Sequence, residues 1–145
     1  EINKMLLDTE KFDLDLSGNI GKLNLNKDAL DINLKISLIK YDQLIDYIVE
    51  SMNFLIQNPS FMGQKTPNLF WQEGLDDAKK KIIIDFIRKI SNDPNSNSDD
   101  VDITVTLPDK KNILELKVGT LTFNELFMEG QVMMQKFLAQ NKQNQ

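Results

Sequence analysis

The sequence contains no cysteine and no histidine among its 145 residues. These absences exclude disulfides, cysteine or histidine zinc sites, thiol nucleophiles and Ser–His–Asp triads. The chain also lacks any apolar run of about 18 residues, the length that a membrane-spanning helix needs. The catalytic groups considered for this chain are therefore its carboxylates.

Positive charge is in short supply, because 17 lysines and arginines stand against 22 acidic residues and give a net charge of −5. A protein that binds DNA or RNA normally presents a basic face to the phosphates, so we expect no nucleic-acid partner. The apolar and charged fractions, 41% and 27%, are typical of a globular chain. A chain of this length can bury enough surface to fold without a disulfide or a metal. We therefore predict one domain over residues 1–145.

Apolar and polar residues alternate in several segments, which indicates strands with one buried face. The clearest is 30–38, where five apolar residues occupy every second position. Turns are expected at Ser17-Gly18-Asn19 and at 26–28, so the first strands form an antiparallel meander. The predicted strands are 12–16, 22–25, 30–38, 101–107 and 114–118.

A helical period replaces this alternation in three segments, 41–57, 75–91 and about 123–140. Segment 58–74 is an apolar connection, and the tail 140–145 is expected to fray. The order of the elements predicts an α+β fold, an antiparallel sheet with helices packed on one face.

The two halves of the chain resemble each other at a shift of 82 positions. Tyr41-Asp42-Gln43-Leu44 then falls on Phe123-Asn124-Glu125-Leu126, and Leu34-Lys35-Ile36-Ser37 on Leu116-Lys117-Val118-Gly119. One interpretation is a pair of strand–turn–strand–helix repeats, 20–57 and 101–139, linked by a helical insert, 58–100. The other is that two hairpin–helix units converge on similar patterns.

Oxygen-bearing side chains alternate in one polar loop, as in the first half of a calcium-binding loop. They are Asp93, Asn95, Asn97 and Asp99. Ser98 stands where such a loop needs glycine, and Thr104 where it needs a bidentate glutamate. We therefore favour a solvated acidic loop and assign no metal or cofactor.

Other charged groups have plain structural interpretations. Carboxylates occur close together at 13 and 15, at 76 and 77, and at 99–102. A hydrolase needs two carboxyls facing each other across a cleft, whereas these are expected on open surface or at a helix start. The lysines at 79–81 suit the solvated side of a helix better than a membrane-surface patch.

Aromatic residues and methionines gather in the apolar connection and on the last helix. This candidate site comprises Phe61, Met62, Phe70, Trp71, Met133 and Met134. Methionine is flexible and suits adaptable binding surfaces, so the cluster is a candidate groove for an apolar small molecule or a protein partner. The alternative is that these residues close the core over the sheet. Met128 falls off the main stripe of its helix, which favours an exposed position.

The run Leu30–Ser37 followed by Tyr41–Ile45 resembles the strand-then-helix segments of large bacterial cell-envelope proteins of the YdgA and AsmA type, whose biochemical function is not established. Residues Leu114 to Leu126 look similar. The resemblance implies an envelope or periplasmic location, an anchor outside this fragment and no enzymatic activity. It supplies no functional residues.

The sequence thus predicts a non-enzymatic, envelope-associated domain that binds an apolar ligand or a protein partner through its helical face. A module that forms homodimers is the first alternative, and a carboxylate-based hydrolase is the second. A cytoplasmic location is the alternative to the envelope. Any contact with a membrane is expected only through a segment outside this chain, which begins at Glu1 rather than at methionine.

Overall fold

The computed structural model describes residues 2–9, 11–20, 32–58, 74–107 and 112–143. Its elements follow one another in a simple order. They are β1 (Ile2–Asp8), β2 (Asp13–Ile20), β3 (Ile32–Ile39), α1 (Tyr41–Gln57), α2 (Asp77–Lys89), β4 (Val101–Leu107), the 3-10 turn η2 (Ile113–Glu115), β5 (Lys117–Val118), β6 (Leu121–Thr122) and α3 (Phe123–Gln143).

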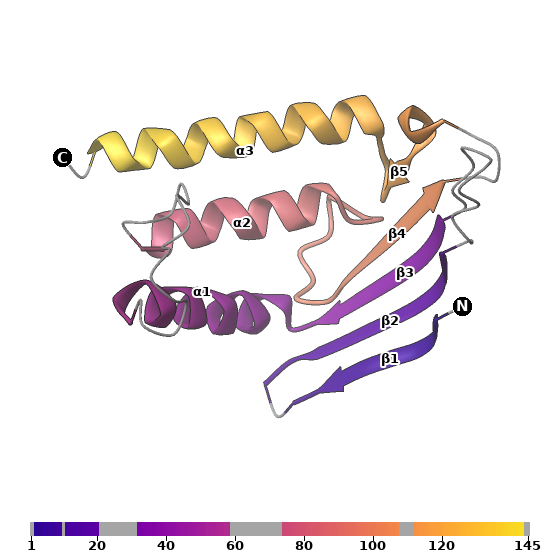
Figure 1. The fold of residues 1–145 in the computed structure, drawn as a ribbon, viewed down its shortest axis with the longest axis horizontal. Helices are drawn as coiled ribbons and strands as arrows, with labels where there is room; N and C mark the ends of the chain where they lie inside the picture. The colour runs from indigo at the N-terminus through magenta and orange to yellow at the C-terminus, as the bar shows by residue number, and fades with distance from the viewer. Residues whose placement is uncertain (1, 10, 21–31, 59–73, 108–111, 144–145) are drawn as a thin grey trace.

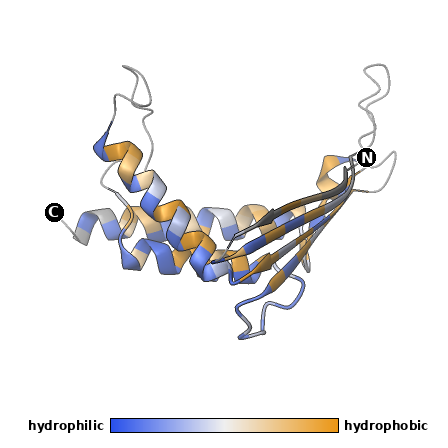
Figure 2. Ribbon diagram, turned by 90° about the horizontal axis from the view of Figure 1, so that it is seen from below, coloured by the Kyte–Doolittle hydropathy of each residue, from blue (hydrophilic) through white to orange (hydrophobic). Residues whose placement is uncertain are grey.

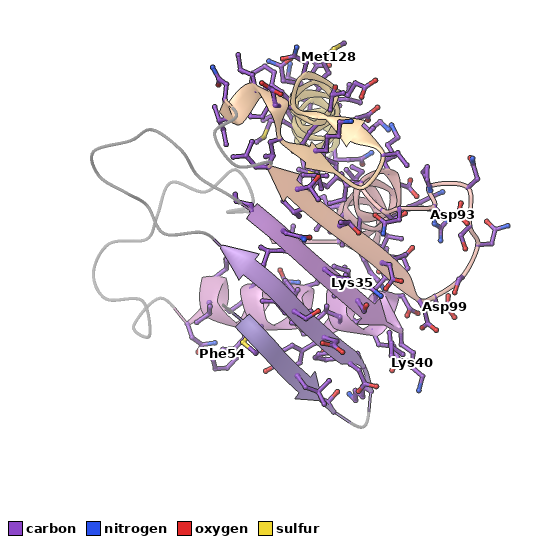
Figure 3. The ribbon with its side chains drawn as sticks, turned by 90° about the vertical axis from the view of Figure 1, so that its right-hand side faces the viewer. Lys35, Lys40, Phe54, Asp93, Asp99 and Met128 are labelled. Carbon is purple, nitrogen blue, oxygen red and sulfur yellow. The ribbon has the colours of Figure 1, made fainter. Side chains whose placement is uncertain are left out.

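The strands form one antiparallel sheet in chain order, from β1 at one edge to β6 at the other. α1 and α2 are inserted between the neighbouring strands β3 and β4. The helices lie side by side with α2 in the middle and reach out beyond the strands (Figure 1). Seen from the sheet, they all lie behind it (Figure 3). This arrangement confirms the predicted α+β fold.

The register aligns apolar residues across the sheet. Leu14 is opposite Leu38, which is opposite Val101. One face of the strands is thus apolar and the other polar, which Figure 2 shows as alternating bands along each strand. The apolar face packs against the helices. The buried members of this core are Leu38, Tyr41, Ile45, Val49, Leu75, Val101, Ile103, Val118 and Phe137.

A single residue, Lys40, joins β3 to α1 in the left-handed conformation, with φ of 53°. Its side chain does not cap the helix. The carboxylate of Asp100 instead accepts a hydrogen bond from the Lys40 backbone N–H at 3.0 Å, and the Asp99 carbonyl accepts one from Tyr41 N–H at 3.0 Å. The polar loop after α2 therefore satisfies two donors at the start of α1, where a negative group is favourable.

One prediction about the first strands is wrong, and one strand is missed. β2 continues through the expected turn at Ser17–Asn19, because Gly18 adopts φ of 131° within the strand and lies close to the backbone of β3. The strand β1 has no predicted counterpart. Its run Met5-Leu6-Leu7 does not alternate, so its strand conformation depends on pairing with β2.

The later elements match in part. The bounds of α1 are those predicted, and α2 and β4 lie within or at the predicted ranges. The expected strand 114–118 is reduced to β5, because Ile113–Glu115 turn into η2. α3 continues as helix to Gln143, three residues beyond the predicted end at about 140, and residues 144–145 lie outside the described residues.

The predicted repeat stays a prediction. α1 and α3 begin 82 residues apart, at Tyr41 and Phe123, as the shift requires. The strands before them differ, because β3 has eight residues whereas β5 and β6 have two each. Residues 22–25, on which the first unit depends, lie outside the described residues.

Candidate docking surface on the last helix

The predicted apolar site falls only partly within the described chain. Phe61, Met62, Phe70 and Trp71 lie outside the described residues. Met133 and Met134 are neighbours on α3 and therefore point about 100° apart. Met133 packs against the core.

The start of α3 is set by a capping box, Thr122-x-x-Glu125. The Glu125 carboxylate accepts hydrogen bonds from the Thr122 N–H at 2.8 Å and from its hydroxyl at 2.9 Å. These bonds, first the backbone one, hold the pKa of Glu125 below its ordinary value. The Thr-x-x-Glu spacing is visible in the sequence, but apolar periodicity alone does not reveal it.

The inner side of α3 is conventional core. Phe137 is 2% exposed, and Leu126 and Met133 pack against the core beside it. These positions recur at the spacing of one helical stripe. They hold α3 against α2 and the sheet, which leaves the opposite side of the helix to the surface.

That opposite side is apolar as well. Phe127 is 60% exposed and Met128 is 64% exposed, and Val132 and Leu138 are also exposed. Figure 3 shows Met128 on the side of α3 turned away from α2. The expected surface position of Met128 is confirmed. We call this side the outer strip, formed by Asn124, Phe127, Met128, Gln131, Val132, Met134, Gln135, Leu138 and Ala139; Val132 lies at its border with α2, Met134 is half-buried and the others are exposed.

Between Asn124 and Ala139 the outer strip carries no charged residue. The charged residues of α3 lie on its other sides, except Lys142, which lies on the side of the strip about one turn beyond its last residue. Glu125 closes the capping box, and Glu129 accepts a hydrogen bond from Lys89 of α2 at 2.6 Å. Lys136 lines the seam between α2 and α3, and Lys142 follows the last residue of the strip. An uncharged surface of this length is unusual for a chain in which 27% of residues are charged.

The seam between α2 and α3 is too narrow for a ligand. Met133 lines it together with Ile82, Phe86 and Val132, and its cavity volume is about 20 Å³. Such a volume holds about one water molecule, whereas small-molecule pockets measure roughly 300–1,000 Å³. Two larger hollows, of about 490 and 370 Å³, lie at the polar loop and beside η2 and are lined mainly by polar side chains.

The loop proposed for calcium lies at the larger of these hollows. Asp93, Asn95, Asn97 and Asp99 are all exposed. Figure 3 shows Asp93 and Asp99 at separate parts of the loop. Within the described ranges, no group of three or more acidic side chains is placed to hold a metal ion. The weak calcium candidate also includes two asparagines, and no observation tests it.

Several carboxylates considered for catalysis have structural contacts. Asp76 caps α2 by accepting a hydrogen bond from Lys79 N–H at 2.9 Å. Asp100 accepts one at the start of α1. Asp102 accepts one from the Ser37 hydroxyl at 2.6 Å and lies 3.6 Å from Lys35 Nζ.

The three consecutive lysines do not share one solvated surface. Lys79 is 1% exposed, and its ammonium donates a hydrogen bond to the Gly74 carbonyl at 3.0 Å. Lys80 forms an ion pair with Asp46 of α1, and Lys81 is exposed. The expectation of a solvated face is thus wrong for Lys79, because its long side chain crosses from the helix to the chain segment before it.

None of the helices in the described part of the chain is long and apolar enough to cross a membrane. The comparisons with known proteins assign no family: no family model matches the chain, and no significant match is found among curated proteins or solved structures. The resemblance to YdgA- and AsmA-type envelope proteins therefore stays a prediction.

Proposed function

We propose that this chain is a non-enzymatic binding domain that docks a helical protein segment on the outer strip of α3. The observation that carries the proposal is the exposure of Phe127, Met128, Val132 and Leu138 in the outer strip, which has no charged residue from Asn124 to Ala139. Docking sites for helices present apolar anchors at helical spacing, and charged residues are depleted at the centre of such interfaces.

The volumes and linings of the hollows favour a protein partner over an apolar small molecule. A small ligand needs a concave, largely apolar pocket, and the apolar seam beside Met133 encloses only about 20 Å³. The outer strip is the surface of a single helix and is convex. A second helix matches such a surface, because side chains of one helix fit between those of the other.

The hydrogen bonds of the carboxylates support the non-enzymatic part of the proposal. Asp76 and Asp100 each satisfy backbone donors at a helix start. Their contacts account for their positions without a substrate. The envelope location implied by the family resemblance belongs to the same proposal and rests on that resemblance alone.

A substitution pair tests the docking surface. Phe127→Ser removes an anchor from the outer strip, and Phe54→Ser removes a similarly exposed phenylalanine from α1, far from Met128 (Figure 3). We expect a fluorescent probe of exposed apolar surface to bind the wild-type chain. The Phe127→Ser variant should lose most of this binding and Phe54→Ser should retain it.

The free energy of unfolding provides the control. Both side chains are largely exposed, so each variant should stay within about 0.5–1 kcal/mol of the wild type in chemical denaturation. Equal probe binding by wild type and Phe127→Ser would contradict the proposal. A large loss of stability in Phe127→Ser would contradict it too, because the side chain would then belong to the protein's own packing.

A further inference from the structure

The spacing of residues in the outer strip is symmetric about Met133. Glutamines stand two positions away on either side, at 131 and 135. Apolar residues stand at one position away, at five and at six. The resulting pairs are Val132 with Met134, Gln131 with Gln135, Met128 with Leu138, and Phe127 with Ala139.

We propose that the segment docked on the outer strip is α3 of a second copy of this chain, antiparallel to the first and related to it by a twofold axis level with Met133. The inference rests on the proposed docking function and names its partner. Twofold contacts require a self-complementary surface, in which residue i of one copy meets residue j of the other and the reverse. A sequence symmetric about one position provides this in an antiparallel helix pair.

Because Met133 points inward, the symmetric pairs of residues lie on the outward side of α3, where a second copy can contact them. Met133 packs inward against the core. Residues at equal distances before and after it are therefore arranged symmetrically about the outward direction of the helix. In the pair, Met128 of one copy meets Leu138 of the second copy, so apolar side chains meet apolar ones. Gln131 meets Gln135 of the second copy, and two amides can each donate and accept a hydrogen bond.

Charge favours the same contact. Each copy has a net charge of −5, so two copies repel each other wherever acidic surfaces meet. Contact through the outer strip brings the two copies together without placing like charges opposite each other. At each end of the pair, Lys142 lies level with Asn124 of the second copy and next to its Glu125. The pair thus gains attraction between opposite charges at its two ends.

The place of α3 in the fold leaves room for a second copy. α2 has a helix on each side, whereas α3 is the outermost helix of the layer (Figure 1). Pairing α3 with α3 would continue the layer across the twofold axis. The 3-10 turn η2, which contacts α3, adds two further exposed apolar side chains, Ile113 and Leu114.

The exposed apolar residues of the edge strand β1 are less suited to pairing. Met5 and Leu6 of the edge strand β1 are both exposed, yet as neighbours in a strand they point to opposite faces of the sheet. They cannot form one continuous apolar surface. Pairing through β1 is therefore an outcome that the experiment must separate from pairing through α3.

Because the chain has no cysteine, single introduced cysteines report the pairing directly. In the antiparallel pair, a cysteine at 131 faces one at 135 of the second copy within disulfide reach, a Cα separation of about 4.4–6.8 Å. Two cysteines at 131 are offset by four residues, about 6 Å along the axis. Mixing Gln131→Cys with Gln135→Cys should thus give several-fold more covalent dimer than either variant alone. Glu50→Cys, exposed on α1, is the background control.

The second substitution in this experiment is Phe127→Ser, added to both cysteine chains. It should lower the yield of covalent dimer at least tenfold. A single helix pair is a small interface, so we expect self-association on the order of 10 µM and weaker. Covalent dimer at equal yield in each variant alone, in the Glu50→Cys control, or despite Phe127→Ser would overturn the antiparallel pair and point to another contact such as β1.

Failure of the inference and failure of the docking function give different results. A chain that stays monomeric and forms no specific disulfide, while Phe127→Ser still abolishes binding of the apolar probe, overturns the second copy and leaves the docking surface in place. A monomer in which Phe127→Ser and Phe54→Ser bind the probe like wild type overturns both. A specific 131–135 disulfide that Phe127→Ser abolishes supports both.

Discussion

α2 and α3 lie side by side but use their surfaces differently. α2 is flanked by a helix on each side, and its lysines make contacts in both directions: Lys80 pairs with Asp46 of α1 and Lys89 with Glu129 of α3. α3 has a helical neighbour only on the side of α2, and its outer strip carries apolar side chains and amides without charge. A middle helix needs two matched sides to fold, whereas an edge helix needs one. The second apolar side of α3 is the feature on which the proposed docking function rests.

The largest expected effect comes from comparing the loss of stability when a phenylalanine is replaced on the inner side of α3 and on its outer strip. Phe137 is 2% exposed and belongs to the core. Phe137→Ala should destabilise the fold by about 3–5 kcal/mol, because it removes a large buried side chain and leaves a cavity. Phe127→Ala should cost less than about 1 kcal/mol at concentrations where the chain is monomeric. Chemical denaturation measures both, and equal losses would remove the distinction between the two sides.

A second test substitutes a glycine where the end of α2 meets the hairpin before α3. Gly119 has φ of 57°, and a Cβ there would lie 2.1 Å from the Ile90 carbonyl oxygen and 2.6 Å from that of Ser91. Gly119→Ala should cost roughly 2–4 kcal/mol, since the backbone of one element must move. The matched control is Gly130→Ala on α3, where a Cβ meets nothing within 4 Å. It should stabilise the helix by about 0.5–1 kcal/mol. Thermal unfolding compares the two; a harmless Gly119→Ala would show that the elements are not held this closely.

Methionine oxidation compares the two sides without any substitution. Met128 is 64% exposed on the outer strip, whereas Met133 packs against the core. Brief treatment with hydrogen peroxide should convert Met128 to the sulfoxide several times faster than Met133, because access governs the rate. Peptide mass spectrometry gives both rates. Raising the protein concentration into the range of self-association should slow oxidation of Met128 and leave Met133 unchanged.

The smallest expected effect concerns the start of α3. The hydrogen bonds from Thr122 lower the pKa of Glu125. A carboxyl whose pKa is lowered by folding contributes stability that is fully present above the ordinary glutamate pKa, about 4.3. This contribution is lost as the pH falls through the lowered value. Melting curves from pH 6 to pH 3 should therefore show a smaller acid-induced loss for Glu125→Gln than for wild type. Parallel curves for the two chains would mean that the capping box contributes no pH dependence.

The sequence predicts those parts of the fold in which local pattern and tertiary packing agree. Strict alternation around Ile36 gave a strand, and the apolar stripe from Tyr41 gave a helix with the observed bounds. β1 was not predicted because Met5-Leu6-Leu7 shows no alternation of apolar and polar residues. Its strand conformation depends on pairing with β2. The turn at Gly18 was wrong because glycine permits a positive φ inside a strand as well as in a turn.

The candidate site was harder to predict than the fold. The sequence grouped Met133 with Met134, although a helix turns them to different sides. It separated Met128 from the main stripe but gave no reason to regard that side as a surface of its own. That reason comes from the position of α3 at the edge of the helix layer (Figure 1), which depends on contacts between distant segments. The symmetry about Met133 is present in the sequence. It can be related to a surface of the helix only once the structure shows that Met133 packs against the core.

The most direct test of the central claim is sedimentation equilibrium of the wild-type chain over a wide range of concentrations, beside the Phe127→Ser/Met128→Ser and Phe54→Ser variants. We predict that the wild type and Phe54→Ser approach the mass of a dimer as concentration rises, while the outer-strip variant stays at the mass of a monomer, 16.7 kDa. A wild-type chain that remains monomeric throughout, or an outer-strip variant that dimerises as readily as wild type, would contradict the account.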